Sequence, residues 1–504
     1  MSVSNRSGLA DFARGLVDLG AILFATEGTA KFLRSEGLQV ADLETITGHG
    51  AILEGRVKTL HPKVHGAILA VPTREEHARD LATLGVEPFD LVVVNLYPFR
   101  QTVAKGAPDA EVIENIDIGG VALLRSAAKN AAHVAVVCDP SQYGKVLDEL
   151  RETGDLSRQT RADLALAAFA LTSSYDAAIT DWLSRRAGHA MPPNLRIAFE
   201  KVQDLRYGEN PYQKAAFYRD PAAAGLSLAD CEQLHGKDLS FNNLLDFHAA
   251  LDLALEFSDP ATIVIKHGNP SGVALRPILA DAYTAAHEAD PKAAYGCVLA
   301  FNRPVDLETV KRMKGHFIEG ILAPAFEADA LERLAKRENI RLMRPRGEWR
   351  DHAGWQAIHV RGGLLVQTTE SPSLEPHQLT VVTKKEPTPE QVRDLLFATK
   401  VCKHAKSNAV VLARDLTTVA IGAGQVSRVD AVKLAAMKAQ GHAAGSVMSS
   451  DAFFPFRDGI DEAAKAGVTA ILQPGGSIRD QEVIDAANEH GIAMAFSGVR
   501  FFRH

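Results

Sequence analysis

Cysteine is scarce in this sequence, and no two cysteines stand close together. The four, Cys138, Cys231, Cys297 and Cys402, form no Cys-x-x-Cys pair, so their spacing argues against a disulfide framework and against a zinc knuckle. Long apolar runs are missing too, since no stretch of about 18 apolar residues occurs. The first residues lack a basic segment leading into an apolar signal core. These absences predict a cytoplasmic protein with no membrane partner.

The chain also has no excess of positive charge. Its 62 acidic and 55 basic side chains give a net charge of −7, which argues against a broad surface for nucleic acid. An anionic substrate must therefore meet local groups of cations. With 504 residues, 46% of them hydrophobic and 23% charged, the composition is that of a globular protein with several domains of roughly 100–200 residues each.

One stretch, Thr262 to Gly272, places two reactive side chains at the end of an expected strand. Its run Ile263-Val-Ile265 is typical of a strand buried on both faces, and Gly268-Asn-Pro270 then breaks the strand. Lys266 and His267 therefore lie at a carboxyl end, where ligands collect in open α/β sheets. A cation beside an imidazole can hold an anion and move a proton. Taken alone, the stretch fits a solvated strand end with a structural histidine equally well.

The first region alternates amphipathic and apolar segments over residues 8–47, which predicts a βαβ arrangement and a parallel sheet. Gly28 and Thr29 lie where a strand passes into a helix. The free amide groups of a helix N-terminus suit a phosphate, but a tight turn with an ordinary cap explains these two residues more simply.

A basic segment follows at residues 55–65, GRVKTLHPKVH. His61 and His65 have the i,i+4 spacing of metal ligands. However, Pro62 disfavours a regular helix and the glutamate of a His-Glu-x-x-His motif is missing. The segment therefore favours anion contacts, and we predict no metal.

Two further segments deliver polar groups. The apolar run that begins at Leu91 predicts a buried strand that carries Tyr97 to its carboxyl end, although a buried tyrosine that merely finds a hydrogen-bond partner is the alternative. Residues 114–130 place Asp117 before a Gly-Gly turn and Lys129 on the helix that follows. A carboxylate and a lysine in one cleft suit acid–base chemistry, whereas a helix cap with a solvated basic face is the alternative.

Taken in order, SVSNRSG (2–8), GRVKTLHP (55–62), NLYPF (95–99) and ENIDIGG…AAKN (114–130) resemble the cyclohydrolase domain of the bifunctional AICAR transformylase/IMP cyclohydrolase family. The resemblance implies an N-terminal fold similar to methylglyoxal synthase. It also implies catalytic or orienting roles for Lys58, Tyr97, Asp117 and Lys129. The residues implied to hold the nucleotide are Ser4, Arg6, Gly28, Thr29, Arg56 and Thr59. One departure is Asn5-Arg6, where the family pattern has Asp-Lys, and arginine does not replace lysine at a site of fixed geometry.

Linker composition predicts the domain boundaries. Residues 185–194, RRAGHAMPPN, predict a boundary near 195. This divides the chain into domains 1–195 and 196–504. A second polar linker lies between about 370 and 390, so we expect two similarly built α/β subdomains at about 196–370 and 371–504.

The second region carries six motifs that resemble the transformylase half of the same family: LRYGENPYQ (205–213), IKHGNPSG (265–272), AFNRPVD (300–306), KSNAVVL (406–412), IGAGQVSR (421–428) and SDAFFPFRDGID (450–461). The resemblance implies a fold similar to cytidine deaminase. The zinc signature of deaminases is absent, so no zinc-activated water is expected. The family often has Cys at the position of Ser271, to which we assign no catalytic role.

The resemblance also implies the reactions. The amine of AICAR attacks the formyl carbon of the cosubstrate 10-formyltetrahydrofolate, and ring closure of formyl-AICAR with loss of water then gives IMP. His267 is the implied base, Lys266 the cation near the formyl oxygen, and Asn408 a holder of that oxygen or of the carboxamide. The 5′-phosphate is expected on Arg206, Tyr207 and Arg500, and the folate on Arg428, Phe453, Asp458 and Ser477.

The family also implies a homodimer, with the transformylase site built across the subunit interface. Two alternatives stay open. The chain could be a transformylase with an impaired cyclohydrolase domain, or a non-catalytic sensor of purine nucleotides.

Overall fold

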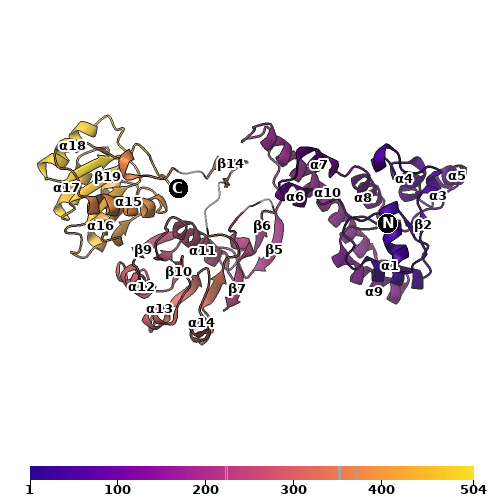
Figure 1. Ribbon diagram of the computed structural model, residues 1–504, viewed down its shortest axis with the longest axis horizontal. Coiled ribbons are helices and arrows are strands. Elements are labelled where there is room, and N and C mark those ends of the chain that lie inside the picture. The colour runs from indigo at the N-terminus through magenta and orange to yellow at the C-terminus, as the bar shows by residue number, and fades with distance from the viewer. Residues whose placement is uncertain (222, 224, 350–353, 370–371) are drawn as a thin grey trace. The chain divides into compact units, whose positions relative to one another are not determined.

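The chain folds into two compact units, Met1–Ala198 and Phe199–His504, which the computed structural model in Figure 1 shows as ribbons. The structure describes residues 1–221, 223, 225–349, 354–369 and 372–504. Both units combine helices with strands, as the sequence predicts for an α/β protein. The expected subdomain boundary at 370–371 lies outside the described residues.

The first unit packs amphipathic helices around short parallel strands. Leu9, Phe12, Ala13 and Leu16 repeat at helical spacing on one helix face, and all four are buried. Strand β1 pairs with β2, and β3 with β4, both in parallel. The elements are α1 (Leu9–Asp18), β1 (Phe24–Ala25), α2 (Glu27–Ser35), β2 (Ala41–Asp42), α3 (Glu44–Thr47), α4 (Pro62–Leu69), α5 (Glu75–Leu84), β3 (Leu91–Val93), α6 (Phe99–Ala104), α7 (Asp109–Glu114), α8 (Gly119–Lys129), β4 (Ala135–Val137), α9 (Tyr143–Thr153) and α10 (Arg158–Arg186).

The second unit is organised around a 12-stranded sheet with the order β15-β20-β19-β18-β16-β17-β9-β8-β10-β11-β12-β7. Its strands are β7 (Glu232–His235), β8 (Ala261–Lys266), β9 (Asn269–Leu275), β10 (Cys297–Phe301), β11 (Ile318–Leu322), β12 (Arg341–Arg344), β15 (Thr380–Val381), β16 (Val410–Arg414), β17 (Thr417–Gly422), β18 (Val447–Ser450), β19 (Ala470–Gln473) and β20 (Ala493–Phe496). The helices are α11 (Phe241–Ala254), α12 (Leu279–Glu288), α13 (Leu307–Arg312), α14 (Ala328–Ala335), α15 (Pro389–Lys403), α16 (Arg428–Lys438), α17 (Asp458–Lys465) and α18 (Asp480–Glu489).

The two halves of this sheet have the same strand order, reflected about its centre. An antiparallel hairpin, β8–β9 or β16–β17, lies innermost in each half. Three parallel strands then follow outward, β10-β11-β12 in one half and β18-β19-β20 in the other. Because β9 and β17 pair antiparallel, the end of β8 and the start of β16 lie at the same edge of the sheet.

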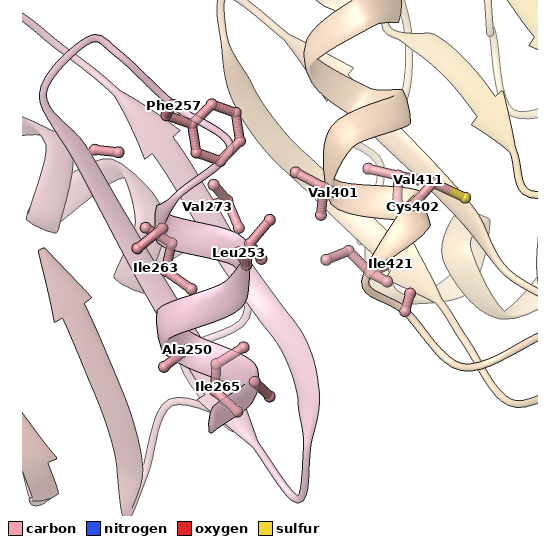
Figure 2. Packing of buried hydrophobic residues seen from close by; sticks show 14 of the residues in the cluster. Ala250, Leu253, Phe257, Ile263, Ile265, Val273, Val401, Cys402, Val411 and Ile421 are labelled. Atoms are coloured by element: carbon pink, nitrogen blue, oxygen red, sulfur yellow. The ribbon is translucent and has the colours of Figure 1, made fainter. Parts of the chain in front are cut away.

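Strand β8 is buried on both faces, which confirms the prediction made from its β-branched run. Ile263, Val264 and Ile265 are all 0% exposed. Ile263 and Ile265 belong to a core cluster with α11 and α15, whereas Val264 packs into a separate cluster with α12. Figure 2 shows side chains of the first cluster from α11, β8 and β9 in one part and from α15, β16 and β17 in the other. The strand end that carries Lys266 is therefore fixed from both sides.

Two short hairpins complete the second unit. Strands β5 (Glu200–Leu205) and β6 (Ala215–Arg219) form one, and β13 (Trp355–Val360) and β14 (Gly363–Thr368) form the other. The second hairpin exposes apolar side chains, among them Ile358 and Leu365. Among the described helices, none is both long and apolar enough to cross a membrane.

A partly buried ionic cluster ties the segment that follows α11 to the end of α15, across the two halves of the sheet. Glu256 Oε1 accepts hydrogen bonds from Lys403 Nζ at 2.5 Å and from His404 Nε2 at 2.9 Å. Burial alone would raise the pKa of Glu256, but the hydrogen bonds and charges of these two partners outweigh burial and lower the pKa to about 2. Burial also lowers the pKa of His404, so Lys403 is the permanent cation of the cluster.

Acid is expected to weaken the second unit through Glu256. A depressed carboxylate pKa stabilises the folded state above the ordinary value of 4.5, and this contribution is lost as the pH falls from 4.5 toward about 2. The loss is at most about 3 kcal/mol of unfolding free energy. Urea unfolding of wild type and Glu256→Gln at pH 7 and pH 3 checks this, because the difference between the two proteins should shrink in acid. Glu332→Gln, which removes an exposed partner of Lys336, should show no such change.

Candidate active sites

The β8–β9 turn holds the predicted pair in a fixed geometry. Lys266 Nζ donates to two backbone carbonyls, Tyr295 O at 3.0 Å and Gly296 O at 2.6 Å. His267 has a φ of 51° and Gly268 a φ of 71°. A left-handed conformation at a residue other than glycine is strained and persists only where the surroundings impose it. Here the turn is pinned by Asp246, whose Oδ1 accepts the Gly268 N–H at 2.7 Å.

Asp246 is a site residue that the sequence analysis missed. It lies on α11 and interacts electrostatically with both Lys266 and His267, and the Lys266 cation favours its ionised form. Burial raises its pKa, the charge of Glu319 adds to that shift, and the Gly268 N–H and the charge of Lys266 offset it only in part. The available signal was a carboxylate set among the apolar residues of Leu244-Leu-Asp-Phe247 on α11, because such a group is rarely buried without a partner.

The loop before β16 brings Asn408 to the same edge of the sheet. Asn269, in the β8–β9 turn, accepts a hydrogen bond from Lys406 N at 3.0 Å. Asn408 Nδ2 donates to Gln425 O at 2.8 Å, and its Oδ1 accepts from Arg428 at 2.6 Å. The predicted grouping of Lys266, His267 and Asn408 therefore rests on two loops that are hydrogen-bonded to each other.

Cations gather near the expected phosphate site. The Arg206 guanidinium lies 5.2 Å from the centre of the Tyr207 ring. Both residues act electrostatically on Arg341, a buried arginine that the sequence analysis missed and whose pKa is lowered by burial. Arg500 is exposed in the C-terminal segment, and its guanidinium lies 4.6 Å from the centre of the Phe502 ring. None of the contacts described joins Arg500 to Arg206.

The four residues expected to bind folate differ in exposure. Phe453 and Asp458 are exposed, and Ser477 is half-buried in a loop in which its Oγ accepts from Arg479 N. Arg428 is only 7% exposed and turns inward to Asn408, Ser450 and Asp451. Its contact with folate remains a prediction.

In the first unit, Lys58, Tyr97 and Asp117 lie together. Lys58 Nζ lies 3.5 Å from the Tyr97 hydroxyl. The Asp117 carboxylate is held by a hydrogen bond from Gly120 N at 2.7 Å, and its own backbone N–H donates to the hydroxyl of Tyr175 on α10 at 2.9 Å. Burial raises the pKa of Asp117, and hydrogen bonds from Gly120 and the Tyr97 backbone and the charge of Lys58 act against that shift. A carboxyl group with a raised pKa beside an amine and a phenol is suited to moving protons.

The Gly119-Gly120 pair allows this close packing at the start of α8. A Cβ at position 120 would lie 2.6 Å from Asp117 Oδ2, and one at position 119 would lie 2.5 Å from Thr59 Oγ1. Thr59 is buried. A side chain at either position would displace the carboxylate or the hydroxyl, so glycine leaves both groups in place.

Lys129 lies away from this group. It is the last residue of α8 and is exposed, whereas Asp117 precedes the first turn. Ten helical residues span about 15 Å, and no contact among those described joins the two. The catalytic role of Lys129 stays a prediction.

Three of the expected nucleotide residues, Arg6, Gly28 and Thr29, lie at the start of α2. A Cβ at Gly28 would lie 3.5 Å from the Arg6 guanidinium, which also lies over the Phe32 ring. Thr29 is buried, and its hydroxyl accepts the Val3 N–H at 3.1 Å. Ser4 N donates to Asn95 Oδ1 at 2.7 Å, so a side chain beyond β3 orders the loop that carries Ser4 and Arg6. Arg56 forms an exposed ion pair with Glu114, a contact that raises the Arg56 pKa.

A cavity of about 680 Å³ in the first unit does not coincide with this group. Its walls are mainly apolar segments of β1 and β3, and of the predicted site residues only Thr59 reaches it. The polar group of Lys58, Tyr97 and Asp117 therefore lies outside this cavity. Within the described ranges, no group of three or more His, Cys, Asp or Glu side chains could hold a metal ion.

Comparison with known proteins decides the family. A family model described as "AICARFT/IMPCHase bienzyme" matches residues 127–438, and one described as "MGS-like domain" matches residues 8–122. The chain belongs to the AICARFT/IMPCHase bienzyme family. It is 48% identical over 507 residues to the bifunctional purine biosynthesis protein PurH of Bacillus cereus (strain AH820) and, equally, to that of Bacillus anthracis (strain CDC 684 / NRRL 3495). Each alignment covers 100% of this chain and 99% of the relative.

Membership of this bienzyme family confirms the predicted function. The chain is a bifunctional AICAR formyltransferase and IMP cyclohydrolase, and its N-terminal domain is of the methylglyoxal-synthase-like type. The alternatives of a single-activity transformylase and of a sensor find no support in the relatives. The likeness of the second unit to cytidine deaminase remains a prediction.

A solved structure described as ForH is 36% identical and covers 36% of this chain and 95% of its own. Its TM-score is 0.33, too low for an assignment of fold.

Proposed function

We propose that this bienzyme carries out its two reactions with separate groups of residues, formyl transfer in the second unit and ring closure in the first. The observation that carries the proposal is the hydrogen bond between the β8–β9 turn and the Asn408 loop. It holds a cation, an imidazole and an amide at one sheet edge. Ring closure is assigned to the first unit on the contacts of Lys58, Tyr97 and Asp117.

In formyl transfer, the AICAR amine attacks the formyl carbon of 10-formyltetrahydrofolate. His267 takes the proton that the amine loses as the new C–N bond forms. Lys266, held in place by two carbonyls, stabilises the negative charge that develops on the formyl oxygen, and Asn408 holds that oxygen or the carboxamide. The bond from the formyl carbon to folate nitrogen then breaks, and that nitrogen leaves with a proton as tetrahydrofolate. Arg206, Tyr207 and Arg500 bind the phosphate of AICAR, and Phe453, Asp458 and Ser477 bind folate.

In ring closure, the carboxamide nitrogen of formyl-AICAR attacks the formyl carbon, and water leaves to give IMP. Lys58 and Tyr97 polarise the formyl oxygen, while Asp117 moves protons between nitrogen and the departing oxygen. Ser4, Arg6, Gly28, Thr29, Arg56 and Thr59 bind the nucleotide, and Lys129 assists. Free amide groups at the start of α2 support a phosphate beside Gly28.

We further propose that the enzyme acts in the cytoplasm as a homodimer. The exposed apolar side chains of the β13–β14 hairpin support an interface there, because a two-stranded hairpin with both faces in water is only marginally stable. The cysteine pattern supports a reducing compartment.

One assay tests the proposal. Wild-type enzyme is supplied with AICAR and 10-formyltetrahydrofolate, and tetrahydrofolate and IMP are followed together. Both products should appear, with IMP lagging behind tetrahydrofolate. Release of tetrahydrofolate without IMP would show that the first unit is inactive, and the absence of both would contradict the proposal.

A further inference from the structure

A buried network connects the Asn408 loop with the C-terminal segment. Its centre is Asp451, which follows β18 directly and is 0% exposed. One oxygen of its carboxylate forms an ion pair with Arg428, and the other accepts a hydrogen bond from Ser407 Oγ at 2.5 Å. A carboxylate buried so deeply persists only where its partners satisfy it.

The first arm of the network orients the Asn408 amide. Arg428 Nη1 donates hydrogen bonds to the Asp451 carboxylate and to Ser450 Oγ, the latter at 2.8 Å. Its Nη2 donates to Asn408 Oδ1 at 2.6 Å. The amide nitrogen of Asn408 donates in the opposite direction, to Gln425 O. The guanidinium is planar and rigid and binds both groups, so the position of Asp451 determines the position of the Asn408 amide.

The second arm fixes the C-terminal segment. Ser407 N donates to Arg503 O at 2.9 Å, and Ser407 Oγ accepts from Arg503 N at 3.0 Å. Asp451 contributes its own backbone as well, because its carbonyl accepts the Phe501 N–H at 2.9 Å. Arg500, the predicted phosphate ligand, is the residue next to Phe501. Its place is therefore set by contacts that converge on Asp451.

We propose that Asp451 is a positioning residue for formyl transfer, which aligns Asn408 through Arg428 and the C-terminal segment of Arg500 through Ser407. The inference rests on the proposed function, because it takes the roles of Asn408 and Arg500 from there. Asp451 touches neither the reacting atoms nor the phosphate. One buried carboxylate thus positions both Asn408, at the reacting end of AICAR, and Arg500, at its phosphate. Small displacements of such groups lower the reaction rate strongly.

Three variants separate the two arms. Ser407→Ala removes the hydroxyl that joins the Asp451 carboxylate to Arg503 N and leaves the backbone hydrogen bonds of this arm, so we expect KM for AICAR to rise about tenfold with little change in kcat. Arg428→Lys keeps a cation for Asp451 but cannot also reach Asn408, so kcat should fall about 30-fold with a smaller change in KM. Asp451→Asn removes the charge that both arms share and should change both constants, each by about tenfold or more.

A matched control distinguishes positioning from general stability. Asp394 is another buried carboxylate of the second unit, where it accepts the backbone N–H groups of Asp415 and Leu416. Asp394→Asn should lower the unfolding temperature without the split between kcat and KM. Cyclisation of supplied formyl-AICAR by each variant reports on the first unit.

The inference is overturned if Asp451→Asn has the same kcat and KM for formyl transfer as Asp394→Asn. If Asp451→Asn does not fold, the same comparison is made with Ser407→Ala and Arg428→Lys. Asn408→Ala tests the underlying role separately. If that variant transfers formyl groups at the wild-type rate, the proposed function of Asn408 fails, whatever the network does.

Discussion

His267→Ala is expected to lose nearly all of its release of tetrahydrofolate and IMP from AICAR and 10-formyltetrahydrofolate, while it still cyclises supplied formyl-AICAR at the wild-type rate. A positioned general base contributes about 10²–10⁴-fold to rate. The loss should lie in this range, because Lys266 is held by backbone carbonyls and the turn is pinned by Asp246, so binding groups remain in place. A spectrophotometric assay of tetrahydrofolate release measures the first reaction, and IMP formation from formyl-AICAR measures the second.

Two variants make this result specific. His442→Ala removes an exposed histidine of the same unit and should leave both reactions unchanged. Asp246→Asn keeps an acceptor for the Gly268 N–H and removes the charge beside the pair, so its transformylase rate should fall between wild type and His267→Ala. Formyl transfer by His267→Ala within threefold of wild type, which is far above the range for loss of a general base, would contradict the assignment.

The sequence predicts the strands and helices that bear the site better than the contacts within it. The β-branched run of β8 fixes the place of Lys266, because full burial allows few residue types. The strand that begins at Leu91 is shorter than its apolar run suggests, since β3 ends at Val93 and leaves Tyr97 in the segment beyond it.

Local sequence patterns do not predict contacts between segments that are distant in the chain. Asp246 meets the Gly268 N–H from another element, and Tyr175 reaches the Asp117 backbone from α10. The expected exposure of Arg428 to folate illustrates the same limit. Its motif, IGAGQVSR, shows an arginine after a glycine-rich turn, but its ion pair with Asp451 depends on the pairing of β16 with β18. Such pairings are properties of the whole sheet.

Asp117→Asn is expected to reverse the pattern of His267→Ala. Tetrahydrofolate should still appear, and formyl-AICAR should accumulate in place of IMP. Loss of the carboxylate removes the group that moves protons in ring closure, at a cost of about 10²–10⁴-fold in rate. Chromatography of the reaction mixture separates formyl-AICAR from IMP and measures each directly.

Gly120→Ala tests the geometry of the same carboxylate without removing it. An added Cβ would fall 2.6 Å from Asp117 Oδ2, so the carboxylate must move away from the position in which Gly120 N holds it. Ring closure should slow by about tenfold or more, since a misplacement near 1 Å is enough for such a loss. Gly144→Ala is the matched control, because this glycine lies in helix α9 with no heavy atom within 4 Å of the added Cβ. Equal rates for Gly120→Ala and Gly144→Ala would contradict the role of Asp117.

The accumulation expected for Asp117→Asn also bears on why the two reactions share one chain. Formyl transfer to a weakly nucleophilic amine is close to thermoneutral, whereas ring closure yields an aromatic purine and draws the first step forward. With ring closure blocked, tetrahydrofolate release should therefore stop at a plateau below full conversion of AICAR. The His267→Ala enzyme supplies only a working first unit. When it is added, tetrahydrofolate release should resume and IMP should form. A mixture that stays at the plateau would show that the first unit of one molecule cannot use formyl-AICAR made by another.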